Sequence, residues 1–219
     1  MAIWHDIADE GRSVFYDWHG EEHMAERLAI KGFLRGRRYI AEKADLEFFN
    51  LYETTDLDVL EGEDYRQRLN NPTPWTVETV QHFRDVNRSL CMVSRSAGVG
   101  GGGLVHTVRY DAPAGAEDAL WGGLLAPLAQ AEGVAGVHLL SANKEASGVS
   151  TAESEARGRP NIVPTRAVLV EGWGDRTPFA NLCNARLSDA ALREHGAIGP
   201  IQSGLYRLQF TIDAPTDPA

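Results

Sequence analysis

A short segment near the N-terminus concentrates residues that can transfer protons or bind a metal. Residues 19–23, His-Gly-Glu-Glu-His, follow the H-x-x-E-H pattern of one group of zinc proteases. Histidines four residues apart share one face of a helix and could share a metal ion. However, Gly20 weakens a helix by about 1 kcal/mol relative to alanine, and no protease-like sequence follows. We therefore predict no metal at this motif and no other cofactor.

Glu22 and His23 are candidates for acid–base chemistry. Residues 12–29 are predicted to be helical, and Glu22 falls on the apolar stripe of that helix, where an unpartnered carboxylate is costly to bury. In one interpretation Glu22 pairs with Arg37 or Arg38 on the next strand. In the other, Glu22 or His23 faces a cavity and transfers protons. The stripe consists of Phe15, Trp18, Glu22, Ala25 and Ala29.

Two predicted strands carry further polar candidates. Residues 33–41 place Phe33, Arg35, Arg37 and Tyr39 on one face, unless Gly36 forms a bulge that shifts the register. An arginine in a closed cavity could bind a carboxylate, phenolate or enolate, although arginines crossing a solvated edge give the same pattern.

On the second strand, residues 46–54, a face of mixed polarity is typical of a ligand cavity rather than a dry core. That face carries Phe48, Asn50 and Tyr52. Tyr52 could exchange protons with a substrate or be a core residue whose hydroxyl is satisfied. His5, Asp6 and Trp75 are further pocket candidates, the tryptophan as a stacking wall. Three residues of the second half could form the opposite wall: His106, His138 and Arg207.

The elements that would position these residues occur in the same order twice. Residues 2–95 predict strand, helix, strand, strand, helix, strand, the last strand spanning 88–95. The second half repeats the order, with strands at 104–110, 134–141, 166–173 and 205–212. This βαββαβ order is that of a ferredoxin-like α+β fold, an antiparallel sheet with both helices on one face. Two such sheets packed face to face would enclose a pocket.

The glycine run at residues 98–103 is the predicted boundary between the two units. It fits G-x-G-x-x-G by letter, but a dinucleotide site needs a helix directly afterwards, and residues 104–108 read as a strand. We therefore predict a first ferredoxin-like half at 1–97, a linker at 98–103 and a second half at 104–219. The long connection at 141–164 lacks apolar periodicity, and we expect it to cover one mouth of the barrel or to lie across a partner subunit.

Three segments carry a family resemblance: FYDWHGEEH at 15–23, IKGFLRGRRY at 30–39 and NPTPWT at 71–76. Together they resemble the dimeric α/β-barrel superfamily, and within it the EthD-like proteins. The resemblance covers residues 2–95 well and the second half only through topology. It implies a barrel fold. It leaves the activity open, because the superfamily includes cofactor-free monooxygenases, isomerases, polyketide cyclases, haem enzymes and members with no known activity.

Charge and composition narrow the function classes. Acidic residues outnumber basic ones by 31 to 21, for a net charge of −10, so we expect neither nucleic acid nor a membrane surface as a partner. No apolar run approaches the roughly 20 residues that span a bilayer. Two widely separated cysteines, Cys91 and Cys183, and no visible signal peptide favour the cytoplasm. A homodimer is one state that the sequence leaves open.

The leading hypothesis is a cofactor-independent enzyme that isomerises, cyclises, cleaves or oxygenates a small hydrophobic, oxygen-bearing molecule between the sheets. The alternative is a non-catalytic ligand-binding or accessory protein. For the enzyme, His23, Arg37 and Tyr52 are expected to supply acid–base, anion-stabilising and orienting groups, with His5 as a reserve base. Glu22, Asn50 and Trp75 are the expected substrate-binding residues.

Overall fold

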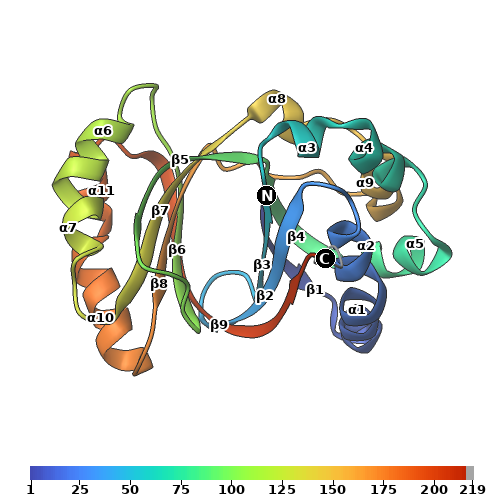
Figure 1. Ribbon diagram of the computed structural model, residues 1–219, viewed down its shortest axis with the longest axis horizontal. Coiled ribbons are helices and arrows are strands. Elements are labelled where there is room, and N and C mark those ends of the chain that lie inside the picture. The colour runs from blue at the N-terminus through green and yellow to red at the C-terminus, as the bar shows by residue number, and fades with distance from the viewer. Residues whose placement is uncertain (216–219) are drawn as a thin grey trace.

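One antiparallel sheet organises the molecule. Within residues 1–215, the part of the chain that the computed structural model describes, nine strands lie in the order β4-β1-β3-β2-β9-β6-β8-β7-β5. The sheet bends so that its two ends face each other, with helices on the outside (Figure 1). The strands are β1 (Ala2–Ile7), β2 (Phe33–Lys43), β3 (Phe48–Thr54), β4 (Phe83–Ser89), β5 (Cys91–Gly98), β6 (Leu104–Asp111), β7 (Val134–Ala142), β8 (Arg166–Gly172) and β9 (Ile198–Asp213).

The helices are short and interrupted. Those of the N-terminal half are η1 (Asp9–Gly11), α1 (Arg12–Trp18), η2 (His19–His23), α2 (Met24–Leu28), α3 (Asp58–Glu61), α4 (Glu63–Asn70) and α5 (Pro74–Val80). Those of the C-terminal half are α6 (Glu117–Leu120), η3 (Trp121–Leu125), α7 (Ala126–Leu128), α8 (Lys144–Ser147), α9 (Ala152–Arg157), α10 (Arg176–Arg186) and α11 (Asp189–Glu194). None of the helices in the described range is long and apolar enough to cross a membrane.

Eight of the nine strands fall into two groups of four, and the ninth, β5, lies at the edge of the sheet beside β7. The first group has the order β4-β1-β3-β2, and the second has the order β9-β6-β8-β7. In each group the strand that comes first along the chain, β1 or β6, lies between the third and the fourth, as the βαββαβ order predicts. The α+β, ferredoxin-like class with a large antiparallel sheet is therefore confirmed. Pairing of β2 with β9, from Arg35 opposite Asp213 to Lys43 opposite Leu205, joins the groups.

The single strand predicted at 88–95 is wrong. The chain is extended there, but Leu90 separates β4, which pairs with β1, from β5, which pairs with β7 in the other group. The two edges of the sheet are therefore consecutive segments of one chain, and the backbone itself closes the ring. Alternation of side chains reveals an extended segment, but not a change of partner along it.

The space between the two groups is mainly a packed core. It contains Trp4, whose ring stacks on Phe49 at 4.8 Å between centroids, and Tyr39, 5.5 Å from the same ring. Residues of both halves contribute, so the two groups share one core in most of the space where a pocket was expected. The buried members are Ala2, Trp4, Tyr39, Leu46, Phe49, Leu51, Val105, Leu140, Ala167, Leu169 and Tyr206.

The predicted face of β2 needs correction at one end. Phe33 packs with the helices, in a cluster with Met24 and Leu28, whereas Arg37 and Tyr39 point into the space between the groups. The register between β2 and β3 shifts between Phe33 and Arg35, which turns Phe33 to the other side. Gly36 is not the position of this irregularity.

The first long helix contains a π turn that also changes a predicted pattern. The segment 12–28 is helical throughout, but His19–His23 adds one residue to a turn. Beyond Trp18 the buried positions are therefore His19, His23, Met24, Arg27 and Leu28, while Ala25 and Ala29 are exposed and Glu22 is half-buried. The predicted stripe holds for the first two turns and then fails, because its period assumed an uninterrupted α-helix.

Candidate functional site

The predicted residues of β1 and β3 lie on the helix-facing side of the sheet, not between the two groups of strands. His5, Asn50 and Tyr52 are buried there beneath the first helix, opposite His23. The rings of His23 and Tyr52 have centroids 6.4 Å apart. The structure thus brings four of the candidates together, on a different face from the expected one.

His5 is a neutral, fully enclosed histidine. Its Nδ1–H donates to the carbonyl of Asp6 at 3.3 Å, so Nε2 is the acceptor for the Asn50 amide, 2.9 Å away. Burial lowers the pKa of His5 to about 3. The other end of the Asn50 amide, Oδ1, is buried without a partner among the described residues, and Asn50 lines a small cavity. His5 therefore orients Asn50.

His19 links Arg38 to Tyr52. Arginine can only donate, so His19 Nδ1 accepts from Arg38 Nη1 at 3.4 Å, and the Nε2–H of neutral His19 donates to the Tyr52 oxygen at 3.3 Å. Burial lowers the pKa of His19 well below its usual value, and the Arg38 charge adds to this effect. Burial raises the pKa of Tyr52, which keeps its hydroxyl protonated. The Tyr52 O–H remains available to donate to a ligand.

Of the three histidines beneath the first helix, His23 is the one with a ring nitrogen that is unpaired among the described residues. Its ring packs on Trp18, 4.2 Å between centroids, and its Nδ1 is buried without a hydrogen-bond partner in the described part of the chain. Burial, together with the charge of Arg27, lowers the pKa of His23 well below its usual value. The ring lines a small, partly open cavity of about 50 Å³ with Trp18, His19, Asn50 and Tyr52. A neutral imidazole there can accept a proton.

Glu22 and Trp75 lie at the edge of this arrangement. Glu22 accepts a hydrogen bond from Thr73 Oγ1 at 2.7 Å, and pairs with neither Arg37 nor Arg38. The same threonine caps α5, whose Thr76 accepts from Trp18 Nε1 at 3.0 Å. Trp75 is half-buried against the aromatic cluster and lines neither the small cavity nor the cleft described next. Both residues support the wall around Trp18.

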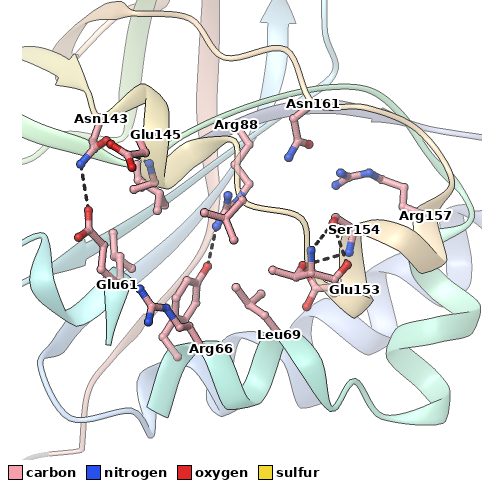
Figure 2. A pocket seen from close by; sticks show the side chains of 16 residues that line it. Glu61, Arg66, Leu69, Arg88, Asn143, Glu145, Glu153, Ser154, Arg157 and Asn161 are labelled. Carbon is pink, nitrogen blue, oxygen red and sulfur yellow. Dashed lines mark hydrogen bonds between the residues drawn. The ribbon is translucent and has the colours of Figure 1, made fainter. Parts of the chain in front are cut away.

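A larger cleft of about 300 Å³ lies next to the small cavity (Figure 2). Tyr65, Arg88, Glu153 and Arg157 line both spaces, so the two are separated by these four side chains. Leucines from α3, α4 and the β4–β5 junction form the apolar part of the wall. Sequence reasoning missed the four shared residues, because they come from three distant segments and no local spacing connects them.

The connection at 141–164 covers this cleft. It contains α8 and α9. From the second group of strands it extends across to the first group and packs against it. Glu153 accepts a 2.5 Å bond from buried Arg27, and Ile162 forms a parallel bridge with Asn87. Further contacts with the N-terminal half run from Asn143 to Glu61, from Ala152 to Asn70, from Arg159 to Phe83 and from Ser89 to Pro164.

Arg37 lies on the opposite face of the sheet from His23 and Tyr52, so the expected three-residue site is not assembled. Its guanidinium forms two bonds to Glu171, of 2.8 and 3.0 Å, and one of 2.7 Å to Glu53. Burial opposes ionisation of Glu171, but nearby His138 and Arg37 outweigh it and lower its pKa to about 2. These groups line a pocket of about 650 Å³ at one end of the space between the sheets.

The predicted opposite wall is formed only in part. His138 lines the inter-sheet pocket, with Nδ1 2.8 Å from Ser96 Oγ. His106 is buried with neither ring nitrogen paired among the described residues, and Arg207 bonds Glu42 at the surface. Within residues 1–215 there is no group of three or more His, Cys, Asp or Glu side chains placed to hold a metal ion.

Comparisons with known proteins identify the fold. No protein-family model matches the chain, and no curated protein matches its sequence. Among solved structures, an anthrone oxidase-like protein superposes with a TM-score of 0.63 at 15% identity, covering 100% of this chain and 93% of the other.

A candidate monooxygenase from Fusobacterium nucleatum subsp. nucleatum superposes with a TM-score of 0.54 at 10% identity, covering 97% of this chain and 93% of the other. At these identities the likeness establishes architecture and leaves the reaction to the site. The chain therefore shares its α+β fold, built on a large antiparallel sheet, with these two solved structures.

Proposed function

We propose that the protein is an enzyme that deprotonates a hydrophobic, oxygen-bearing substrate in the cavity beneath the first helix. One observation carries this proposal: His23, neutral and with a buried nitrogen unpaired among the described residues, lines the same small cavity as Tyr52. A base and a hydrogen-bond donor on one cavity are the two groups that enolate or phenolate formation requires.

The first chemical step follows from these positions. A proton leaves a carbon or phenol of the substrate and binds the His23 imidazole, and the electron pair remains on the substrate as an enolate or phenolate. The Tyr52 O–H donates to the developing oxyanion, while the His19–Arg38 chain behind it holds the tyrosine oxygen in place. The positive charges of Arg27 and Arg38 favour a substrate anion, but burial and Arg27 also oppose protonation of His23, so the negative charge of that anion must stabilise the imidazolium.

Oxygenation is the reaction class that we propose beyond this step. The anthrone oxidase-like neighbour suggests a substrate with an activated CH₂ group. With dioxygen as the co-reactant, CH₂ and O₂ give a carbonyl and one water, so the atoms and electrons balance. The cavity of about 50 Å³ admits only a few water-sized molecules, so the body of the substrate would occupy the 300 Å³ cleft.

We also propose that residues 1–97 and 104–219 are two copies of one unit. In support, both groups of strands have the same order, and both first helices contain a π turn at the same place, His19–His23 and Trp121–Leu125. Only the first copy carries histidines in its π turn, which assigns the chemistry to the N-terminal half. The placement among EthD-like proteins stays a prediction.

Dioxygen uptake with anthrone as the probe tests the function. The wild-type protein should consume one O₂ per anthrone oxidised. His23→Ala should lower turnover by about 10²- to 10⁴-fold, and Tyr52→Phe by about 10²-fold. His138→Gln, on the other side of the sheet, is the matched control and should retain wild-type turnover.

Two results would separate the alternatives. Wild-type turnover in His23→Ala would remove His23 as the base. If anthrone instead binds and quenches Trp18 fluorescence without any oxygen uptake, the protein is better described as a non-catalytic ligand-binding protein.

A further inference from the structure

Two arginines at the inner end of the cleft have no carboxylate partner in the part of the chain that the structure describes. Arg88, on β4, donates from Nη2 to the Tyr65 hydroxyl at 3.0 Å, and Arg157, on α9, donates from Nε to the carbonyl of Arg159 at 3.3 Å. Neither forms an ion pair within residues 1–215, although the protein carries an excess of acidic residues. Both line the cleft and the small cavity behind it.

The carboxylates nearby are engaged elsewhere or lie outside. Glu153 binds Arg27, whose side chain is 2% exposed, at 2.5 Å. Glu61 accepts from the Asn143 amide at 2.9 Å, and Glu145 is exposed at the rim. Two cations therefore face one partly buried space without a committed counter-charge.

The surroundings of Arg157 are consistent with this imbalance. Burial lowers the pKa of Arg157, and the positive charge of Arg88 adds to that effect against the opposing influence of Glu153. Asn161 also lines the cleft (Figure 2), and its buried Oδ1 has no partner in the described chain. The amide nitrogen of Asn161 is a further donor for an anion in this place.

We propose that Arg88 and Arg157 bind the carboxylate of the substrate, which makes the substrate a hydrophobic acid. This inference rests on the proposed function and names its substrate class. Guanidinium groups bind carboxylates through paired N–H donors, and the cleft offers apolar contacts for the rest of the molecule. Those contacts come from Leu60, Leu69, Leu90 and Val149.

Such a carboxylate would also join two parts of the fold. Arg88 belongs to the sheet of the first group, whereas Arg157 belongs to the covering connection. An anion between them would join α9 to β4 at the inner end of the cleft, next to the small cavity that contains His23, with the apolar part of the acid in the cleft.

Fluorescence titration with 9-anthracenecarboxylate tests the proposal, with the neutral 9-anthracenemethanol as the matched probe. The wild-type protein should bind the acid at least 10-fold more tightly than the alcohol. Arg88→Gln and Arg157→Gln should each raise the Kd of the acid about 10- to 100-fold and leave the Kd of the alcohol unchanged. Arg186→Gln, on α10 at the far side of the molecule, is the charge-matched control and should change neither Kd.

Three outcomes would overturn the proposal: equal wild-type affinity for acid and alcohol, unchanged acid binding in both variants, or displacement of the acid by inorganic phosphate at a lower concentration than by benzoate. The wild-type comparison of the two probes needs no variant to fold.

The outcome of the binding test is also independent of the proposed reaction. If His23→Ala retained full turnover while Arg88→Gln weakened acid binding, the proposed chemistry would fail and the carboxylate site would stand.

Discussion

At the scale of single residues, the unusual feature is a group of three histidines, buried beneath the first helix, that stay neutral. Each has a pKa lowered by burial, His5 to about 3, and His19 and His23 well below the ordinary value. In the unfolded chain they titrate near 6.5. Below that pH the unfolded state binds more protons than the folded state. The stability that these groups confer is therefore complete above pH 6.5 and is lost as the pH falls toward 3.

The first residue-scale prediction is a steep acid dependence of stability. Each such histidine contributes a slope of about 1.4 kcal/mol per pH unit once its unfolded form is protonated. Replacing His5 by glutamine should remove one such slope between pH 6 and pH 5, measured as the free energy of unfolding in urea. Val80→Ala, in the same cluster but without a titratable group, should lower stability equally at both pH values. An unchanged slope in His5→Gln would contradict the buried-neutral assignment.

At the scale of elements, the connection at 141–164 is the part that distinguishes the two halves. The corresponding link in the first half, between β2 and β3, spans only four residues, 44–47. In the 141–164 connection, α9 contributes Glu153 and Arg157 to the wall between the cleft and the small cavity. A substrate that reaches His23 from the cleft must displace or reorder that wall. We therefore expect α9 to act as a lid.

Hydrogen exchange tests the lid. Saturating 9-anthracenecarboxylate should slow exchange of the amides in 152–157 by about 10-fold or more, because ordering a covering segment raises the free energy of its local opening. Exchange in 176–194, on the far side of the molecule, serves as the internal control and should not change. Exchange at 152–157 that stays fast on binding would rule out a lid.

At the scale of the whole molecule, the Arg37–Glu171 pair links the two groups of strands. Arg37 lies on β2 and Glu171 on β8, and their side chains are 6% and 4% exposed. Replacing Glu171 by glutamine leaves a buried guanidinium with one carboxylate fewer, and it should lower the free energy of unfolding by about 3–5 kcal/mol. The double variant Arg37→Met, Glu171→Leu should recover most of this loss, as measured in urea.

A surface ion pair provides the control for this prediction. Arg12 and Glu47 form a similar two-bond pair, but their side chains are 38% and 28% exposed. Replacing Glu47 by glutamine should cost about 1 kcal/mol or less, because water compensates for the lost partner. Equal losses at the two sites would show that burial does not govern the Arg37–Glu171 contribution.

Much of the architecture was predictable from local patterns. The strands expected at 2–7 and 46–54 correspond to β1 and β3, and the Thr73–Pro74 pair begins α5. These features depend on neighbouring residues, through strand propensity and helix capping. The βαββαβ order then determined the strand order within each half. The sequence also identified His23, Tyr52, Asn50 and His5 as polar residues within otherwise apolar elements.

The tertiary structure alone decided which face those residues use. A period of two assigns Asn50 and Tyr52 to the same side of β3 as each other, but it does not say which side meets helices and which meets the other sheet. The π turn at 19–23 and the register shift after Phe33 each displace a pattern by one residue, and neither is encoded in spacing alone. Arg88 and Arg157 meet through packing of a distant connection, so only the folded chain reveals the cleft. Local residue types determined the elements and the available chemistry, whereas long-range pairing determined the site.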